Sequence, residues 1–258
     1  MMTKINLIDI GSVGGFDIPW SFNTDKIEYS LSFEPNDQPI LNSKNLRYNS
    51  AIWNFDGEAN FYVSGHNGTG SSLLKQNFTW VNNNFDAIKN NGNKKLNQSW
   101  FERSKITNEF KCQVKKLDTV LSEIHAAIGE DIKFHFLKSD TQSGEYYVLE
   151  GAENFLKTDC LGLELELYRY PLYENIILEQ EVKDYLRSLG FFVAGWTGYK
   201  NSFESQADYL FLKKEAKNQE EQNIIDLIKE VYKPQRGGII KHRSLLQKVT
   251  AKLKMNLK

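Results

Sequence analysis

The stretch that most constrains this chain is a short apolar run near its N-terminus that leads into a glycine-rich turn. The run covers residues 5–10, broken only by Asn6 and Asp9, and glycine follows at positions 11, 14 and 15. A short run rich in β-branched residues is typical of a buried parallel strand. Glycine lets the next loop adopt positive φ and lets a ligand approach the backbone. Because ligands of open α/β sheets bind at such a loop, the stretch predicts a nucleotide-like ligand, with a plain strand–turn–helix connection as the alternative.

The size and composition fit one large α/β domain with an insertion, or two small domains. The chain has 258 residues, of which 40% are hydrophobic and 25% are charged, so it can bury a sizeable core. No apolar run approaches the roughly 18 residues of a membrane-spanning helix, and residues 1–4 lead directly into the first strand, so we expect neither a span nor a signal peptide. Cys112 and Cys160 have neither metal-ligand nor redox spacing, which indicates reduced thiols, a cytoplasmic location and no metal site.

The charge of the chain is unevenly distributed. Eight basic residues and no acid follow Tyr232, so the residues before them carry a net charge of −9, against −1 for the whole chain. The acidic body argues against a nucleic-acid partner. From Gly237 onward, apolar residues recur at helical spacing among the lysines, which predicts a cationic amphipathic helix. This tail can pack on the domain or a partner subunit, or make a peripheral contact with the inner face of an anionic membrane. The oligomeric state is left open.

Strand and helix signals alternate along most of the chain, which predicts βαβ units and a parallel sheet. The expected strands cover residues 5–10, 29–33, 46–53, 59–63, 134–137, 160–167, 191–194 and 209–213, and the last two pair with each other. The expected helices cover residues 36–42, 117–128, 146–156, 179–189 and 224–231. Asp56-Gly57 is a hairpin turn signal before the fourth of these strands.

The pattern breaks down between Thr69 and Ile106. Residues 81–98 are rich in asparagine and are flanked by aromatic residues. A long irregular segment in a compact domain is usually disordered or a functional lid. We therefore expect residues 1–215 to form the main domain, with an Asn-rich insert over about 75–108 that serves as a lid or is only a surface excursion. Residues 216–258 then form C-terminal helices that end in the basic tail.

An acid after the second strand narrows the choice of ligand. Glu34 lies 19 residues beyond Gly15, where α/β nucleotide folds place a carboxylate that accepts hydrogen bonds from ribose hydroxyls. Val13 takes the place of the second glycine of G-x-G-x-x-G, and no G-x-x-x-x-G-K-[ST] is found, so NAD and ATP are disfavoured. The remaining pattern, D-x-G-x-x-x-G with an acid after strand two, is the arrangement of adenosylmethionine-dependent methyltransferases.

A second motif is more specific. Residues 136–152 read FLKSDTQSGEYYVLEGA, which resembles the F-L-K-x-D-x-Q/E-G-x-E-x-x-V-L-x-G-A signature of the FkbM-type methyltransferases. Four other pieces are similar to this family in matching order: the opening strand at residues 7–11, the second-strand acid at 33–35, the hairpin at 56–64 and the V-x-x-L-D-x-L segment at 114–121. The resemblance covers roughly residues 4–213. Ser12-Val13 replaces the family's Ala-Asn, and Ser143 replaces a glycine.

The resemblance implies a class I Rossmann-like methyltransferase fold, with a mostly parallel seven-stranded sheet and an antiparallel last strand. It implies S-adenosyl-L-methionine as cofactor and methyl transfer to an oxygen, often a hydroxyl of a sugar, glycan or related metabolite. A degenerate, non-catalytic partner in a polysaccharide assembly complex and an N-methyltransferase are the alternatives. The residues expected to bind the cofactor are Asp9, Gly11, Ser12, Gly15, Glu34, Ala51 and Asp140.

Three residues are candidates for catalysis. Asp140 ends the strand expected from residue 134 onward, and Glu145 begins the helix after it. Either can take the proton of the acceptor, or Asp140 orients the methionyl amine and Glu145 only caps the helix. His66 lies between glycines after the hairpin and is a candidate base or substrate contact. His135 is interpreted as a hydrogen-bonded core residue rather than a catalyst.

Overall fold

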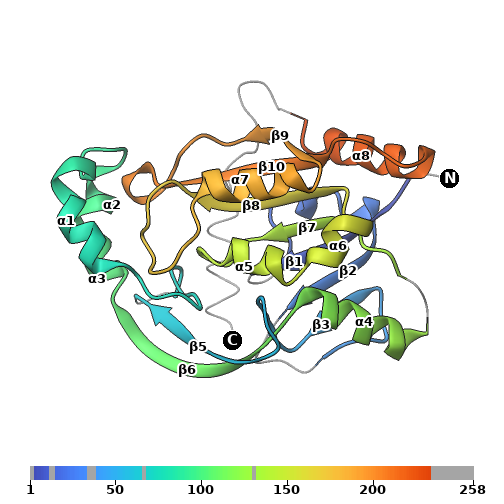
Figure 1. Cartoon of the computed structure of the whole chain (residues 1–258), viewed down its shortest axis with the longest axis horizontal. Helices are drawn as coiled ribbons and strands as arrows, with labels where there is room; N and C mark the ends of the chain where they lie inside the picture. Colours follow the sequence, from blue (N-terminus) through green and yellow to red (C-terminus); the bar gives the residue numbers. More distant parts are fainter. Residues whose placement is uncertain (1–2, 12–14, 34–38, 66–67, 130–131, 234–258) are drawn as a thin grey trace.

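The protein is built on a seven-stranded sheet (Figure 1). The computed structural model describes residues 3–11, 15–33, 39–65, 68–129 and 132–233. The strand order is β3-β2-β1-β7-β8-β10-β9, and β10 alone runs antiparallel to its neighbours. The strands are β1 (Ile5–Ile10), β2 (Ile27–Phe33), β3 (Asn45–Tyr48), β7 (Phe136–Ser139), β8 (Gly162–Tyr168), β9 (Phe191–Trp196) and β10 (Gln206–Lys213). The predicted Rossmann-like sheet with an antiparallel last strand is confirmed.

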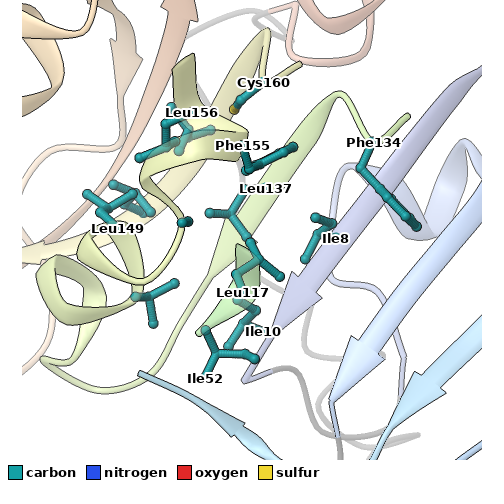
Figure 2. Packing of buried hydrophobic residues seen from close by; sticks show 14 of the residues in the cluster. Ile8, Ile10, Ile52, Leu117, Phe134, Leu137, Leu149, Phe155, Leu156 and Cys160 are labelled. Atoms are coloured by element: carbon teal, nitrogen blue, oxygen red, sulfur yellow. The ribbon is translucent and has the colours of Figure 1, made fainter. Parts of the chain in front are cut away.

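Four helices cover one face of this sheet. They are α4 (Leu117–Ile128), α5 (Glu145–Glu150), α6 (Glu153–Thr158) and α7 (Glu179–Ser188). Figure 2 shows Ile8 and Ile10 of β1 packed with Leu137 of β7 and with apolar side chains of these helices. The single helix predicted over residues 146–156 is wrong, because two helices form there. Asp118 of α4 explains the break, since its carboxylate accepts hydrogen bonds from the backbone N–H groups of Asn154 and Phe155 and so starts a new helix.

The opposite face is covered differently. Helix α8 (Gln219–Val231) packs there on Ile5, Leu7 and Phe136. The crossover from β1 to β2 holds two short 3₁₀ helices, Trp20–Phe22 and Thr24–Lys26. The helix predicted over 36–42 does not form in its described part, residues 39–42. Strand β2 has only polar residues on this face, namely Glu28, Ser30 and Ser32, so it offers no apolar surface for a helix to cover. No helix in the described ranges is long and apolar enough to cross a membrane.

A second, three-stranded sheet lies beside the first. Its order is β4 (Ala51–Ile52), β6 (Ile106–Lys115), β5 (Gly57–Ser64). The single strand predicted over 46–53 is therefore wrong, because it divides between the two sheets. Asp56-Gly57 is no hairpin turn either, since β6 separates β4 from β5. Asp56 instead accepts hydrogen bonds from the Lys116 N–H (2.7 Å) and the Thr119 hydroxyl (2.9 Å), and these bonds fix the start of α4.

The Asn-rich insert is helical, not irregular. It forms α1 (Phe78–Ile88), α2 (Lys94–Gln98) and α3 (Trp100–Arg103), which lie together at one end of the molecule (Figure 1). Asparagine is a weak helix former but a strong N-cap, and Asn77 and Asn93 cap α1 and α2 in this way. The aromatic residues of the insert form an apolar cluster with Tyr168 at the end of β8 and Phe203 of the β9–β10 loop.

Candidate functional site

The carboxyl ends of β1 and β7 meet at the predicted glycine loop. The Asp140 N–H donates to the Ile10 carbonyl (2.9 Å). Gly11 has φ +89°, and a Cβ atom there would lie 2.0 Å from the Asp140 carbonyl oxygen. Only glycine fits this contact. The structure therefore brings together the first glycine of the loop and the acid after β7, which are two of the residues expected to bind the cofactor.

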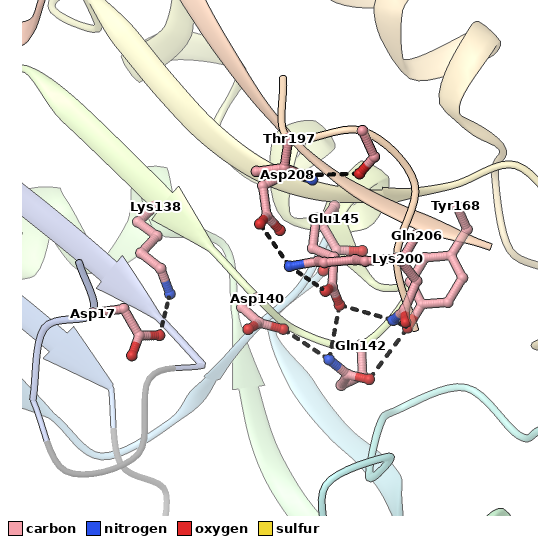
Figure 3. A network of polar contacts seen from close by, with 12 residues as sticks. Asp17, Lys138, Asp140, Gln142, Glu145, Tyr168, Thr197, Lys200, Gln206 and Asp208 are labelled. Carbon is pink, nitrogen blue, oxygen red and sulfur yellow. Dashed lines mark hydrogen bonds and ion pairs between the residues drawn. The ribbon is translucent and has the colours of Figure 1, made fainter. Parts of the chain in front are cut away.

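A row of charged side chains crosses the sheet below this contact. Asp9, Lys138 and Glu164 are register neighbours on β1, β7 and β8. The Lys138 ammonium lies 3.3 Å from Asp17 (Figure 3) and 3.9 Å from Asp9. Burial opposes the charge of Lys138, but the carboxylates of Asp9 and Asp140 raise its pKa above the ordinary value. Asp9, only 3% exposed, therefore serves first to neutralise a buried lysine below the loop.

Asp140 belongs to a second polar network (Figure 3). The Gln142 amide donates to Asp140 Oδ1 (2.8 Å) and to Glu166 Oε2 (3.0 Å), and its oxygen accepts from the Tyr168 hydroxyl (3.2 Å). Gln206 donates to the same Glu166 oxygen (2.9 Å). These bonds orient the half-buried Asp140 through one carboxylate oxygen, while the other has no hydrogen-bond partner among the described residues.

Lys200 balances the acids of this network. Its ammonium contacts Asp208 at 2.6 Å and Glu166 at 3.4 Å. Burial, followed by the charge of Asp140, raises the pKa of Glu166 well above its ordinary value. Burial likewise raises the pKa of Glu164 to about 7. The edge of the sheet thus combines a buried lysine, Lys138, and a partly buried one, Lys200, with carboxyl groups that hold protons more tightly than free carboxyl groups do.

The loop after Asp140 has an unusual backbone. Gln142 and Ser143 have φ of +54° and +86°, in the left-handed region that glycine favours. Ser143 is 2% exposed, and its hydroxyl has no hydrogen-bond partner among the described residues. Gly144 is required for another reason, because a Cβ there would lie 2.7 Å from the Trp53 ring. The place of a family glycine is thus taken by a residue that keeps the glycine-like conformation.

Glu145 holds this loop together. One of its oxygens accepts from the Thr141 N–H (2.8 Å) and from the Thr141 hydroxyl (3.0 Å). Burial raises the pKa of Glu145 to about 8, so it is largely protonated at neutral pH. An enclosed, protonated carboxyl group that already accepts two hydrogen bonds is poorly suited to remove a proton from an acceptor. The geometry favours the alternative that Glu145 fixes the start of α5.

The remaining predicted residues lie elsewhere or outside the described ranges. Ala51 begins β4, next to Ile52, and Figure 2 shows Ile52 close to Ile10 at the end of β1. Gly15 has φ +111°. Ser12, Glu34 and His66, together with the tail from Gly237, are outside the described residues. His135 accepts a hydrogen bond from the Asn6 N–H (3.2 Å), and burial lowers its pKa, in agreement with a structural histidine.

Several residues of the site were not predicted. They are Lys138, Gln142, Glu166, Lys200 and Asp208. A signal for one of them exists in the sequence, because residues 162–168 read GLELELY, where glutamates alternate with leucines in a strand at the middle of the sheet. Buried charges are rare unless they are paired, so this alternation marks a polar face that needs buried partners.

The family described as "Methyltransferase FkbM domain" matches residues 10–193. This match covers well over half of the sequence. The chain belongs to the FkbM methyltransferase family. Among curated proteins no match is found.

Two solved structures are similar to this FkbM-family chain. Methyltransferase FkbM from Methylobacillus flagellatus KT has 12% sequence identity and a TM-score of 0.45, and the match covers 80% of this chain but only 43% of that one. Sp1610 from Streptococcus pneumoniae has 13% identity and a TM-score of 0.34, with 99% of this chain and 85% of that one covered. Its structure was solved with S-adenosyl-L-methionine, and it is proposed to be a tRNA (m1A22) methyltransferase.

Proposed function

We propose that this FkbM-family protein is an S-adenosyl-L-methionine-dependent O-methyltransferase that acts on a hydroxyl of a sugar, a glycan or a related metabolite. The observation that carries the proposal is the contact between Gly11 and Asp140 at the carboxyl edge of the sheet. It places a glycine with positive φ next to an oriented, half-buried carboxylate. This edge is where open α/β sheets bind their ligands.

The residues at this edge fit the cofactor. Gly11 lets the turn after β1 pack against the Asp140 backbone, where a Cβ atom has no space, and so keeps the turn beside the Asp140 carboxylate. Asp140 supplies a negative charge for the ammonium or sulfonium group. When bound, S-adenosyl-L-methionine supplies a methyl group on a positively charged sulfur. Because Lys138 is neutralised by Asp9 and Asp17, its positive charge does not oppose such a cation.

Asp140 is the residue best placed to act on the acceptor hydroxyl. Its Oδ1 is held by Gln142, which leaves Oδ2 to accept a hydrogen bond from the acceptor. An alcohol must lose its proton as the methyl group arrives, and a positioned base contributes roughly 10²–10⁴-fold to such a step. Asp140 can instead orient the methionyl amine through the same oxygen. Because both roles use Oδ2, they are distinguished by the effects of substituting Asp140.

Titration calorimetry with S-adenosyl-L-methionine and its demethylated product tests the cofactor. The wild type should bind both at micromolar level, and G11A should bind neither, because its Cβ would displace Asp140.

D140N separates the two roles of Asp140. If Asp140 is the base, D140N lowers methyl transfer and keeps the cofactor affinity. If Asp140 contacts the methionyl amine, D140N lowers the cofactor affinity. The exposed Asp184, substituted as D184N, is the control for charge. A folded wild type that binds neither molecule would support the degenerate-partner alternative.

We further propose that the protein is cytoplasmic and contacts an anionic membrane peripherally through its C-terminal tail. A cytoplasmic protein with a cationic amphipathic tail can bind peripherally to anionic membranes, where lipid-linked glycans are assembled. Deletion of residues 237–258 should then release the protein from vesicles that contain phosphatidylserine, at unchanged cofactor affinity. Equal sedimentation of the full chain and the truncated chain with those vesicles would contradict this role.

A further inference from the structure

An arginine at the end of β8 is held rigidly but makes few polar contacts. The guanidinium of Arg169 lies 4.0 Å from the centre of the Tyr199 ring and 4.8 Å from the centre of the Tyr170 ring. Tyr199 is held in turn by a hydrogen bond to Glu179 (2.7 Å), and Tyr170 stacks on Trp80 of the insert. Two aromatic rings thus fix the orientation of the planar fork.

The hydrogen-bonding capacity of this fork is largely unused. Nη2 donates to the Phe203 carbonyl at 3.3 Å and lies 3.7 Å from a Glu204 oxygen, while Nε is enclosed and has no hydrogen-bond partner among the described residues. A guanidinium has five N–H donors. Arg103, which contacts the same β9–β10 loop, shows the contrast, because it makes three hydrogen bonds of 2.8–3.0 Å and serves to hold structure.

Arg169 adjoins the polar network of the candidate site. It directly follows Tyr168, whose hydroxyl donates to Gln142, and Gln142 holds Asp140. Its own N–H donates to the Ser205 carbonyl (2.9 Å), next to Gln206 of the network. Arg169 therefore lies at the carboxyl edge of the sheet, beside β8 and β10. The glycine loop after β1 lies farther along the same edge.

We propose that Arg169 binds an oxyanion of the methyl acceptor, so that the acceptor is an acidic sugar bearing a carboxylate or a phosphate rather than a neutral one. A preorganised arginine fork binds two oxygens of such a group at once. This inference rests on the proposed function, because it places the acceptor on the β8–β10 side of the cofactor loop.

Glu204 marks the place of the oxyanion. Its side chain is 46% exposed, and at 3.7 Å it is too distant for a hydrogen bond. Its backbone has φ +48°, and a Cβ on Gly92 of the insert would lie only 2.6 Å from its Cγ. The carboxylate of Glu204 thus competes weakly for the fork, and an acceptor oxyanion displaces it. Removal of Arg169 and removal of Glu204 should have opposite effects.

Binding of three sugars in the presence of the demethylated cofactor tests the proposal. The probes are glucuronate, glucose 6-phosphate and neutral glucose, which separate the carboxylate from the phosphate. We expect the wild type to bind one acidic sugar at least tenfold more tightly than glucose. R169Q and R169K should lose that preference, and E204Q should increase it severalfold. R187Q, at an exposed arginine, controls for net charge, and R103Q controls for loosening of the loop.

The outcomes separate this inference from the proposed function. Equal binding of acidic and neutral sugars, or an unchanged preference in R169K with a wild-type melting temperature, would overturn the role of Arg169. If cofactor binding is normal in either case, the methyltransferase proposal stands. Loss of cofactor binding in the wild type would instead remove the basis of both. R169K keeps the charge and the aliphatic stem, so it remains informative if R169Q fails to fold.

Discussion

At the scale of single residues, the loop after β7 keeps conformations that its side chains disfavour. Gln142 offsets its positive φ with three side-chain hydrogen bonds that orient Asp140. Ser143 has no such compensation, because its hydroxyl is enclosed without a described partner. The positive φ of Gln142 is therefore accompanied by hydrogen bonds that orient Asp140, while the positive φ of Ser143 is not. Substitution of Ser143 tests whether its backbone is strained.

Ser143→Gly should stabilise the protein. A residue in the left-handed region costs about 1–2 kcal/mol, and glycine gives part of this back through its larger entropy in the unfolded chain. We expect the free energy of unfolding to rise by about 1 kcal/mol in urea denaturation. Ser122→Gly, in the middle of α4 and exposed, should instead lower it by about 1 kcal/mol. If both variants lose stability, Ser143 is not strained.

Glu145 should make stability depend on pH. Its pKa is about 8 in the folded protein because of burial, against the ordinary 4.5. The folded state therefore holds a proton that the unfolded state has lost, and stability falls as pH rises from about 4.5 to 8. In Glu145→Gln the group cannot ionise, and Oε1 still accepts from Thr141. The variant should match the wild type near pH 5 and gain up to about 1.4 kcal/mol per pH unit from there to about pH 8. Parallel stability curves for the two proteins would contradict the raised pKa.

At the scale of elements, Asn97 joins the insert to the main sheet. It is fully buried, its amide donates to the carbonyls of Lys89 and Asn91, and its oxygen accepts from the N–H of Phe203 (2.6 Å) in the β9–β10 loop. That loop also carries Glu204 and contacts Arg169. One asparagine thus sets the position of two elements beside the candidate site.

Asn97→Ala should loosen the insert. It leaves the buried Phe203 N–H and the half-buried carbonyls of Lys89 and Asn91 without this partner, at about 1–3 kcal/mol for each group that stays enclosed. We expect a loss of about 3 kcal/mol and faster hydrogen exchange in α1–α3 and in residues 201–205. Asn83, exposed on α1, is the matched control, and Asn83→Ala should change neither quantity. Exchange that accelerates equally throughout the protein would mean that the insert does not open as a separate unit.

The elements also show which features can be predicted from sequence. Strand β1, helix α4 and the pair β9 and β10 follow from local periodicity, and the contact of Gly11 with Asp140 follows from two motifs at parallel strand ends. The β4-β6-β5 order depends on a pairing across about 50 residues, which no local signal carries. The helices of the insert depend on asparagine caps. Lys138 and Lys200 belong to the site because they contact carboxylates of neighbouring strands, and only the folded chain places these carboxylates beside them.

At the scale of the whole molecule, one face of the sheet changes from apolar to charged along its strands. Leu7 and Phe136 lie under α8. Asp9, Lys138 and Glu164 lie on the same face, two residues further along their strands toward the site. Tyr232, just after α8, sits at this boundary: its hydroxyl donates to Glu164 and accepts from Trp20 Nε1 (3.0 Å). The end of the last described helix, the β1–β2 crossover and a central strand are thereby joined through one oxygen atom.

Tyr232→Phe should destabilise the protein as a whole. It leaves the buried Trp20 N–H and the Glu164 carboxyl group each without one partner, and we expect a loss of about 1–3 kcal/mol. Tyr232 helps Glu164 to ionise, so the pKa of Glu164 should rise above 7, and the loss should be larger at pH 8 than at pH 6. Because the three elements share one core, far-UV and near-UV circular dichroism should report a single transition at a lower temperature. Tyr62→Phe, at a buried tyrosine whose hydroxyl has no described hydrogen bond, should leave the melting temperature unchanged. A Tyr232→Phe protein that melts in two steps would show instead that α8 unfolds independently of the sheet.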